Sequence, residues 1–134
     1  MSSGTEPSSA GHRAGVAQAS ELFVFPQYNW GYPAPLKNAL DFLYFEWRDK
    51  PATTVTYGTR GGNRGADQLR GVLDGLHMRS LEDRLEIVIT DDDVDEEWQL
   101  RDLDATLRPY LEQVKRLDAQ LVAVIRRGTR GDVL

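Results

Sequence analysis

The order of apolar patterns along the chain constrains the fold more than any other feature of this sequence. Short apolar or β-branched runs at 21–25, 50–58 and 84–90 alternate with longer stretches of helical period. A parallel connection between strands needs about a dozen or more residues, which these stretches supply. Such connections are right-handed and lay helices on the faces of the sheet. The sequence therefore predicts an α/β fold with three layers, in which helices flank a short parallel sheet of three strands.

Each of the three runs has strand character for its own reason. The run ELFVF at 21–25 is continuously apolar and stops at Pro26, which suits a strand buried on both faces. The run at 50–58 is rich in β-branched residues and ends in glycine. The run at 84–90 alternates apolar and polar side chains, as a strand with one buried face does.

Two amphipathic stretches connect these strands. The first begins at Pro35, a residue suited to a first helical position, and its apolar stripe is Leu36, Ala39, Leu40, Leu43 and Trp47. Other aromatic residues lie off that stripe, so a helix over 36–47 is apolar on more than one face. We therefore expect a homodimer through this helix. The second stretch follows a glycine loop and has its stripe at Leu69, Val72, Leu73 and Leu76.

The stretch 100–125 repeats apolar residues at alternating gaps of three and four. This spacing predicts a long amphipathic helix that kinks or begins near Pro109 and is capped by Gly128. The same spacing fits a coiled coil, and an adaptor built on these heptads is one alternative. Packing on the sheet is favoured, because the upstream strands need covering.

The composition indicates one globular domain. The 134 residues are 40% hydrophobic and 28% charged, which is enough apolar material for a modest core and too much for a disordered chain. We expect a leader at 1–20 that is mobile, because it is rich in Ser, Gly and Ala, with a helical turn at 16–19. The domain is then 21–128 and the tail 129–134.

Charge and cysteine content exclude several functions. A formal charge of −5 disfavours nucleic acid and anionic membranes as partners. With zero cysteines the chain has no disulfide, thiolate nucleophile or sulfur-ligated metal, and it suits a reducing compartment. No secretory h-region or membrane-length run is present, so we expect a cytoplasmic protein. The acidic segment 91–102 lacks the glycine and final glutamate of a calcium loop, so we predict a solvated linker and no metal site.

Two loops follow the first two predicted strands and should be neighbours, because ligands of parallel sheets bind at the carboxyl ends of the strands. The loop PQYNWGY at 26–32 offers flat rings on a proline-stiffened backbone, and YGTRGGNRG at 57–65 offers glycines that let a ligand approach. Together they suit a planar heteroaromatic ligand. Plain packing and a tight βα turn are the simpler interpretations, since the glycines match neither the dinucleotide fingerprint nor the P-loop. Whether Arg60 and Arg64 contact a cofactor phosphate or only flank the turn stays open.

Three segments together resemble the NADPH-dependent FMN reductase family of flavodoxin-like NAD(P)H oxidoreductases, which includes quinone and azo-dye reductases. They are PQYNWGYPAPLKNALDFL, KPATTVTYGTRGG and QLRGVLDGLHMR, and the resemblance runs from about Glu21 to Met78. It implies a partial flavodoxin-like fold, with FMN and NADPH as cofactors. That family begins with a strand, a Ser/Arg-containing phosphate loop, a helix and a second strand. None of these is recognised before Glu21, so we expect a domain truncated at its N-terminus.

The resemblance also implies a cofactor site. In the family the first turn lies along the isoalloxazine edge, with main-chain amides near N5 and O4, and the glycine turn faces the pyrimidine end. The corresponding residues here are Pro26, Gln27, Tyr28, Asn29, Trp30, Gly31, Gly58, Thr59, Arg60, Gly61 and Gly62. Hydride would pass from nicotinamide to flavin N5, and electrons would then pass to a quinone, azo compound or similar acceptor. The flavin carries the chemistry, so no catalytic side chain is expected.

One alternative function needs no flavin. A chain without the phosphate loop would be a non-catalytic remnant that associates with itself or with a partner through the 36–47 helix and the edge strand 21–25.

Overall fold

The computed structural model describes residues 20–131, with side chains through Arg127. The expected leader and its helical turn at 16–19 lie outside the described residues. The strands are β1 (Glu21–Pro26), β2 (Pro51–Gly58), β3 (Arg79–Ser80) and β4 (Leu85–Val88). The α-helices are α2 (Ala34–Asp41), α3 (Asn63–Gly75), α4 (Leu103–Leu107) and α5 (Leu111–Gly131). Short 3-10 turns lie at Phe45–Trp47, Asp91–Asp93 and Arg108–Tyr110.

All described strand pairs are parallel, and β2 is the centre of the sheet. It pairs with β1 on one side, where Pro26 is opposite Tyr57. On its other side it pairs with β3 near its start and with β4 near its end, where Val55 is opposite Leu85. The strand predicted at 84–90 is β4, and the two-residue strand β3 that precedes it was not predicted. Within residues 20–131 the outer edge of β1 has no partner strand.

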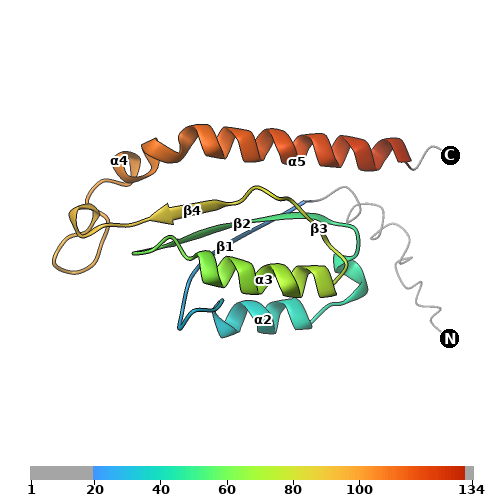
Figure 1. The fold of residues 1–134 in the computed structure, drawn as a ribbon, viewed down its shortest axis with the longest axis horizontal. Coiled ribbons are helices and arrows are strands. Elements are labelled where there is room, and N and C mark those ends of the chain that lie inside the picture. Colours follow the sequence, from blue (N-terminus) through green and yellow to red (C-terminus); the bar gives the residue numbers. More distant parts are fainter. Residues whose placement is uncertain (1–19, 132–134) are drawn as a thin grey trace, which may run out of the picture.

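Helices cover both faces of this sheet, which confirms the predicted three layers. Figure 1 shows α2 and α3 against one face and α5 against the other. The larger core lies under α2 and α3 and consists of Phe25, Leu40, Ala52, Leu69, Leu73, Leu76 and Met78. The smaller core lies under α5 and consists of Leu85, Ile87 and Leu117. α5 therefore packs on the sheet through Leu117, as favoured above, while Leu111 and Val114 of the same stripe are 49% and 46% exposed.

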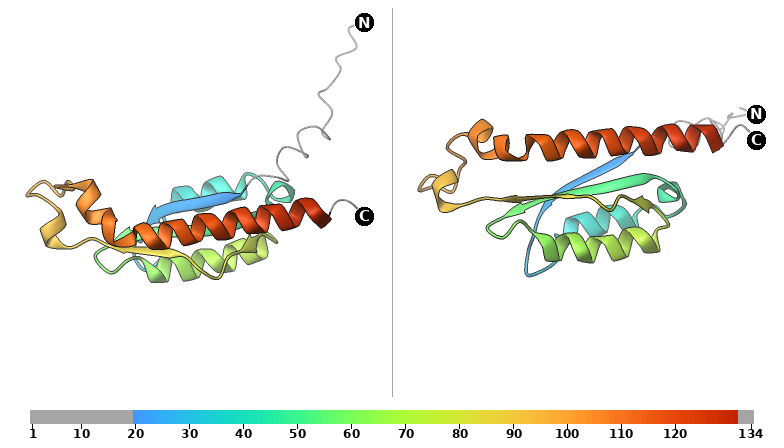
Figure 2. Two further views of the ribbon diagram at one scale, coloured as in Figure 1. Left: turned by 90° about the horizontal axis from the view of Figure 1, so that it is seen from above. Right: turned by 45° about the horizontal axis from the view of Figure 1, so that its top comes forward.

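β1 is buried on one face only, so the prediction of a strand buried on both faces was wrong. Phe25 is 3% exposed against α2 and α3, whereas Leu22 and Val24, on the opposite face, are 52% and 59% exposed. The view from above in Figure 2 shows the reason, because β1 lies to one side of α5 and not beneath it. Within residues 20–131, the apolar side chains on this face of β1 are thus left uncovered beside α5.

The helix expected over 36–47 ends at Asp41, so its second half was predicted wrongly. The carbonyl of Leu40 accepts a hydrogen bond from Trp47 Nε1 at 3.0 Å, besides a longer one from the Leu43 N–H at 3.4 Å. The Tyr44 N–H donates to the Glu46 carboxylate at 3.2 Å and begins a 3-10 turn. Side chains therefore take over the hydrogen bonds that another helical turn would have made. Phe42 and Phe45 therefore lie beyond the α-helix, Phe45 at the start of the 3-10 turn.

The C-terminal segment breaks near Pro109, as predicted. Asp102 caps α4 by accepting a hydrogen bond from the Ala105 N–H at 3.2 Å. A 3-10 turn containing Pro109 follows, and the Tyr110 hydroxyl then accepts a hydrogen bond from the Val88 N–H at 2.9 Å. That bond ties the start of α5 to the end of β4. The expected cap at Gly128 was wrong, because α5 continues to Gly131.

Among the described helices, none is both long and apolar enough to cross a bilayer.

Candidate functional site

The loop after β1 is a tight turn with an unusual backbone. Tyr28 and Gly31 exchange two hydrogen bonds, N–H to O, each at 2.9 Å. The two residues between them, Asn29 and Trp30, have φ of 48° and 68°. A two-residue hairpin turn with both central residues left-handed is the type I′ turn, in which glycine or asparagine is usual and tryptophan is rare. Left-handed bulky residues cluster at functional sites, so Trp30 marks this loop as a candidate.

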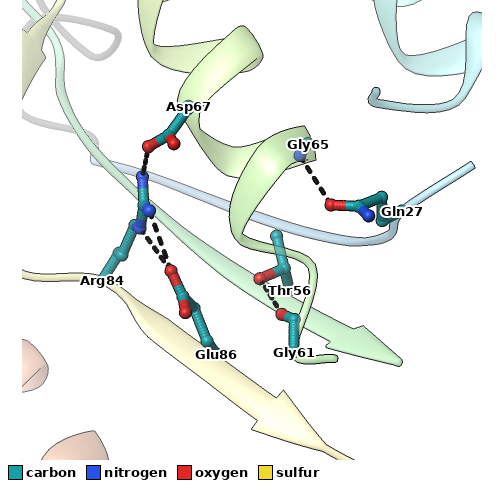
Figure 3. A network of polar contacts seen from close by, with 7 residues as sticks. All are labelled: Gln27, Thr56, Gly61, Gly65, Asp67, Arg84 and Glu86. Atoms are coloured by element: carbon teal, nitrogen blue, oxygen red, sulfur yellow. Dashed lines mark hydrogen bonds and ion pairs between the residues drawn. The ribbon is translucent and has the colours of Figure 1, made fainter. Parts of the chain in front are cut away.

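Two glutamine side chains anchor this turn to α3. The Gln27 carboxamide oxygen accepts a hydrogen bond from the Gly65 N–H at 2.9 Å (Figure 3). The Gln68 carboxamide oxygen accepts one from the Tyr32 N–H at 3.2 Å. A Cβ at Gly31 would collide with that same Gln68 oxygen, so a side chain there would displace the Gln68 carboxamide from the Tyr32 N–H. The turn is held at both of its ends, while the Tyr28 and Trp30 rings are exposed.

The loop after β2 owes its shape to glycines held against a buried threonine. Gly61 and Gly62 have φ of 78° and 82°, a backbone conformation in which residues other than glycine are strained. Thr56, fully buried, donates its hydroxyl proton to the Gly61 carbonyl at 2.5 Å (Figure 3). Thr59 and Arg60 form the exposed tip of this loop. Gly61 and Gly62 are thus buried beneath the loop, and only its tip at Thr59 and Arg60 is exposed.

These two loops are neighbours, as the sequence predicted. They leave the carboxyl ends of β1 and β2, whose last paired residues are Pro26 and Tyr57. A Cβ built on Gly62 lies 3.6 Å from the Cβ of Gln27, so the loops touch. The predicted residues at 26–31 and 58–62 thus border one surface at the end of the sheet where α/β proteins bind ligands. Their role as cofactor contacts stays a prediction.

An ion-pair network holds the glycine loop from its other side. Arg84 pairs with Asp67 of α3 at 2.6 Å and with Glu86 of β4 at 2.8 Å (Figure 3). Burial alone would lower the pKa of Arg84, but its hydrogen bonds to the two carboxylates outweigh burial and raise it. A Cβ on Gly61 would lie only 3.2 Å from the Cβ of Glu86. The network therefore fixes the strand against which the glycine loop packs.

Sequence reasoning missed some residues that shape this site. Thr56 was counted only as a strand residue, and Gln68 only as part of the helix. The sequence could have indicated Gln68 as a residue near the site, since it lies one helical turn after Arg64 on the same face of α3. No local signal existed for the contact of Arg64, whose guanidinium lies over the Trp30 ring at 3.6 Å from the ring centroid. That contact joins the turn after β1 to the first turn of α3, and only the fold brings them together.

Comparison with known proteins gives a consistent result. A family model described as NADPH-dependent FMN reductase matches residues 17–93, more than half of the chain. An NAD(P)H-dependent FMN reductase of Saccharomyces cerevisiae is 63% identical over 57 residues, which are 42% of this chain and 30% of the yeast protein. An NADPH:quinone oxidoreductase of Arabidopsis thaliana is 47% identical over 65 residues, covering 44% of this chain and 33% of the plant protein. Each match thus spans about a third of the relative.

A solved structure shares the fold at low sequence identity. It is a flavoenzyme NAD(P)H:(acceptor) oxidoreductase from Paracoccus denitrificans, 18% identical to this chain. The superposition covers 94% of this chain and 70% of the bacterial chain, with a TM-score of 0.56. This similarity confirms the expected flavodoxin-like α/β fold.

Proposed function

Because this chain belongs to the NADPH-dependent FMN reductase family, we propose that it acts in the FMN-dependent oxidation of NAD(P)H. The family match confirms the resemblance seen in the sequence. When bound, FMN supplies the chemistry: it accepts hydride from NAD(P)H and returns electrons to an acceptor. A quinone, an azo compound or a similar small molecule is the acceptor we propose. The chain's own residues bind and orient the flavin and take no proton or covalent role.

The observation that carries this proposal is the contact between the two loops. Gln27 bonds the N–H of Gly65 and touches Gly62, so the turn and the glycine loop form one rigid border. The turn uses the N–H groups of Tyr28 and Gly31 for its own two bonds, which leaves those of Asn29 and Trp30 to donate to a ligand. A flavin ring presents acceptor atoms along one edge, so main-chain donors beside flat rings fit it.

The described residues supply one wall of such a site. The outer edge of β1 is open within residues 20–131, and Leu22 and Val24 beside it are exposed. We therefore expect weaker FMN binding by this chain alone than by a protein with a second wall.

The test is a titration of the purified chain with FMN, followed by quenching of flavin fluorescence. We expect saturable quenching in the micromolar range. Tyr28→Ala and Gly61→Val should weaken it, because one removes a wall ring and the other strains the loop. Gly71→Val is the matched control for Gly61→Val, since Gly71 lies on α3 with nothing within 4 Å of its Cβ position. Absence of quenching at millimolar FMN, in a chain folded by circular dichroism, would contradict the proposal.

A second candidate function is self-association, in which the chain works as a non-catalytic module. The observation that favours it is the segment Phe42–Phe45, where Phe42 is 85% and Phe45 is 75% exposed. Neighbouring exposed rings of this size are typical of interaction surfaces. The homodimer we propose therefore forms through the segment that follows α2, and not through a helix over 36–47.

The cytoplasm remains the compartment we propose. Its support is the cysteine count of zero, which suits a reducing environment.

A further inference from the structure

The contact between Arg64 and Trp30 has no role in the fold described so far. The Arg64 guanidinium carbon lies 3.6 Å from the centroid of the indole ring, and both side chains are exposed. Trp30 belongs to the turn after β1, whereas Arg64 belongs to the first turn of α3. Since neither side chain contributes to a buried cluster, packing does not explain why they meet.

Arg64 has a carboxylate within reach along its own helix, yet it does not pair with it. Asp67 is three residues further on, a spacing at which helical ion pairs form. Its carboxylate is instead bound to Arg84 at 2.6 Å (Figure 3). Within residues 20–131, neither Arg64 nor Arg60 forms an ion pair, in a chain whose formal charge is −5. Two positive charges at the rim of the site are thus left without a counter-ion from the described chain.

Stacking prepares a guanidinium for anion binding. A guanidinium that lies flat on an aromatic ring keeps its N–H donors in its own plane, directed away from the ring. The planar fork matches two oxygens of a phosphate group. In this structure the guanidinium carbon lies 3.6 Å from the ring centroid, and such a contact restricts the side chain before an anion binds. The position of the indole ring is in turn determined by the left-handed backbone of Trp30 in its hydrogen-bonded turn.

From these contacts we infer that Arg64, positioned by Trp30, binds the phosphate of a nucleotide cofactor at this site. The inference rests on the proposed function for the identity of the nucleotide. Arg60, at the tip of the glycine loop, adds a second positive charge to the same rim. The chemical class is a phosphate monoester or diphosphate. FMN and the nicotinamide dinucleotides both carry such a group, and the experiment separates them.

The first measurement uses inorganic pyrophosphate on the flavin-free full chain. The ¹⁵N-labelled indole N–H signal of Trp30, assigned with Trp30→Phe, reports whether the anion binds beside the ring. We expect a saturable shift in the wild type and a shift at least ~10-fold less sensitive to pyrophosphate in Arg64→Gln, because a charge-assisted bond is lost. Arg116→Gln, which removes one exposed arginine of α5, is the matched control and should behave as the wild type.

The second measurement identifies the ligand by paired titrations. Riboflavin is compared with FMN, and NAD⁺ with NADP⁺, by calorimetry on the wild type and both variants. Riboflavin lacks the phosphate of FMN, whereas NAD⁺ and NADP⁺ share a diphosphate and only NADP⁺ carries a 2′-phosphate. The inference holds if Arg64→Gln lowers affinity at least ~10-fold for FMN and not for riboflavin, for NADP⁺ and not for NAD⁺, or for both dinucleotides equally, the last result assigning the contact to the diphosphate. The affected pair shows which cofactor provides the phosphate.

Two results would overturn the inference. One is a pyrophosphate response that is the same in Arg64→Gln as in the wild type. The other is an equal loss in Arg64→Gln and Arg116→Gln, which would show only a general effect of net charge. Failure of the proposed function would give a different result. Neither riboflavin nor FMN would then bind, while pyrophosphate would still shift the Trp30 signal. Flavin binding without any pyrophosphate response would reject Arg64 alone.

Discussion

At the scale of single residues, the glycine loop depends on the backbone of Gly62. Its φ is 82°, and a Cβ there would come 2.8 Å from the Cβ of Thr56. Thr56 cannot give way cheaply, because it is fully buried and donates a hydrogen bond to Gly61. A side chain at position 62 therefore meets backbone strain and a steric clash together.

We predict that Gly62→Ala lowers the free energy of unfolding by roughly 2–3 kcal/mol. Gly71→Ala is the control, since Gly71 lies inside α3 with open space around it and should gain roughly 0.5–1 kcal/mol. Urea denaturation of both variants measures the difference. Equal stability of the two would show that the loop can relax around a methyl group.

At the scale of elements, Asp93 links three segments that lie beyond β4. Its Oδ2 accepts hydrogen bonds from the Thr90 N–H at 2.7 Å and the Thr90 hydroxyl at 2.8 Å. Its Oδ1 accepts one from the buried Thr106 hydroxyl of α4 at 3.0 Å. The Thr90 main chain first, then the two hydroxyls, lower the pKa of Asp93 below its ordinary value of 3.8. The carboxylate thus holds the end of β4 to α4.

The lowered pKa predicts how stability depends on acid. A carboxyl group with a depressed folded-state pKa stabilises the fold above its unfolded-state pKa, and the contribution is lost as pH falls through the folded-state value. The window therefore lies below about pH 4. We expect Asp93→Asn to flatten the pH dependence of unfolding there, measured by thermal melts between about pH 2 and 5.

Asp92→Asn provides the matched control for that experiment. Asp92 lies in the same 3-10 turn and accepts no hydrogen bond from the part of the chain that the structure describes. An equal flattening in both variants would assign the effect to the density of negative charge in the acidic segment.

At the scale of the whole molecule, two of the places where apolar side chains are exposed lie on opposite faces of the sheet. The segment Phe42–Phe45 follows α2, and Leu22 and Val24 lie on the opposite face of the sheet beside α5. A dimer through the first would leave the second open. The two surfaces can therefore be tested independently.

We predict that the chain dimerises through Phe42–Phe45. Sedimentation velocity should show a dimer for the wild type and a monomer for the double variant Phe42→Ser with Phe45→Ser, because each loses most of a large apolar contact. Val24→Thr, which makes the open face of β1 more polar, should leave the dimer intact. Dissociation by Val24→Thr alone would place the interface on β1.

Local sequence was enough to predict the strands at β1 and β2, the helix α3, the break near Pro109 and the adjacency of the two loops. These features follow from side-chain period, from glycine and proline positions, and from the right-handed rule for parallel crossovers. The glycine loop at 61 and 62 could also be predicted from local sequence, because a left-handed backbone strongly favours glycine.

Tertiary structure decided what depends on residues far apart in the chain. Leu22 and Val24 are exposed because no described element covers that side of β1, a fact absent from their local pattern. α2 ends at Asp41, where the Trp47 indole N–H donates a hydrogen bond to the Leu40 carbonyl. Arg64 meets Trp30 only because Gln27 and Gln68 hold the turn against α3. The period of apolar residues indicates which side chains share one face of a helix or strand. Whether that face is buried, and what it contacts, depends on which distant segment of the chain packs against it.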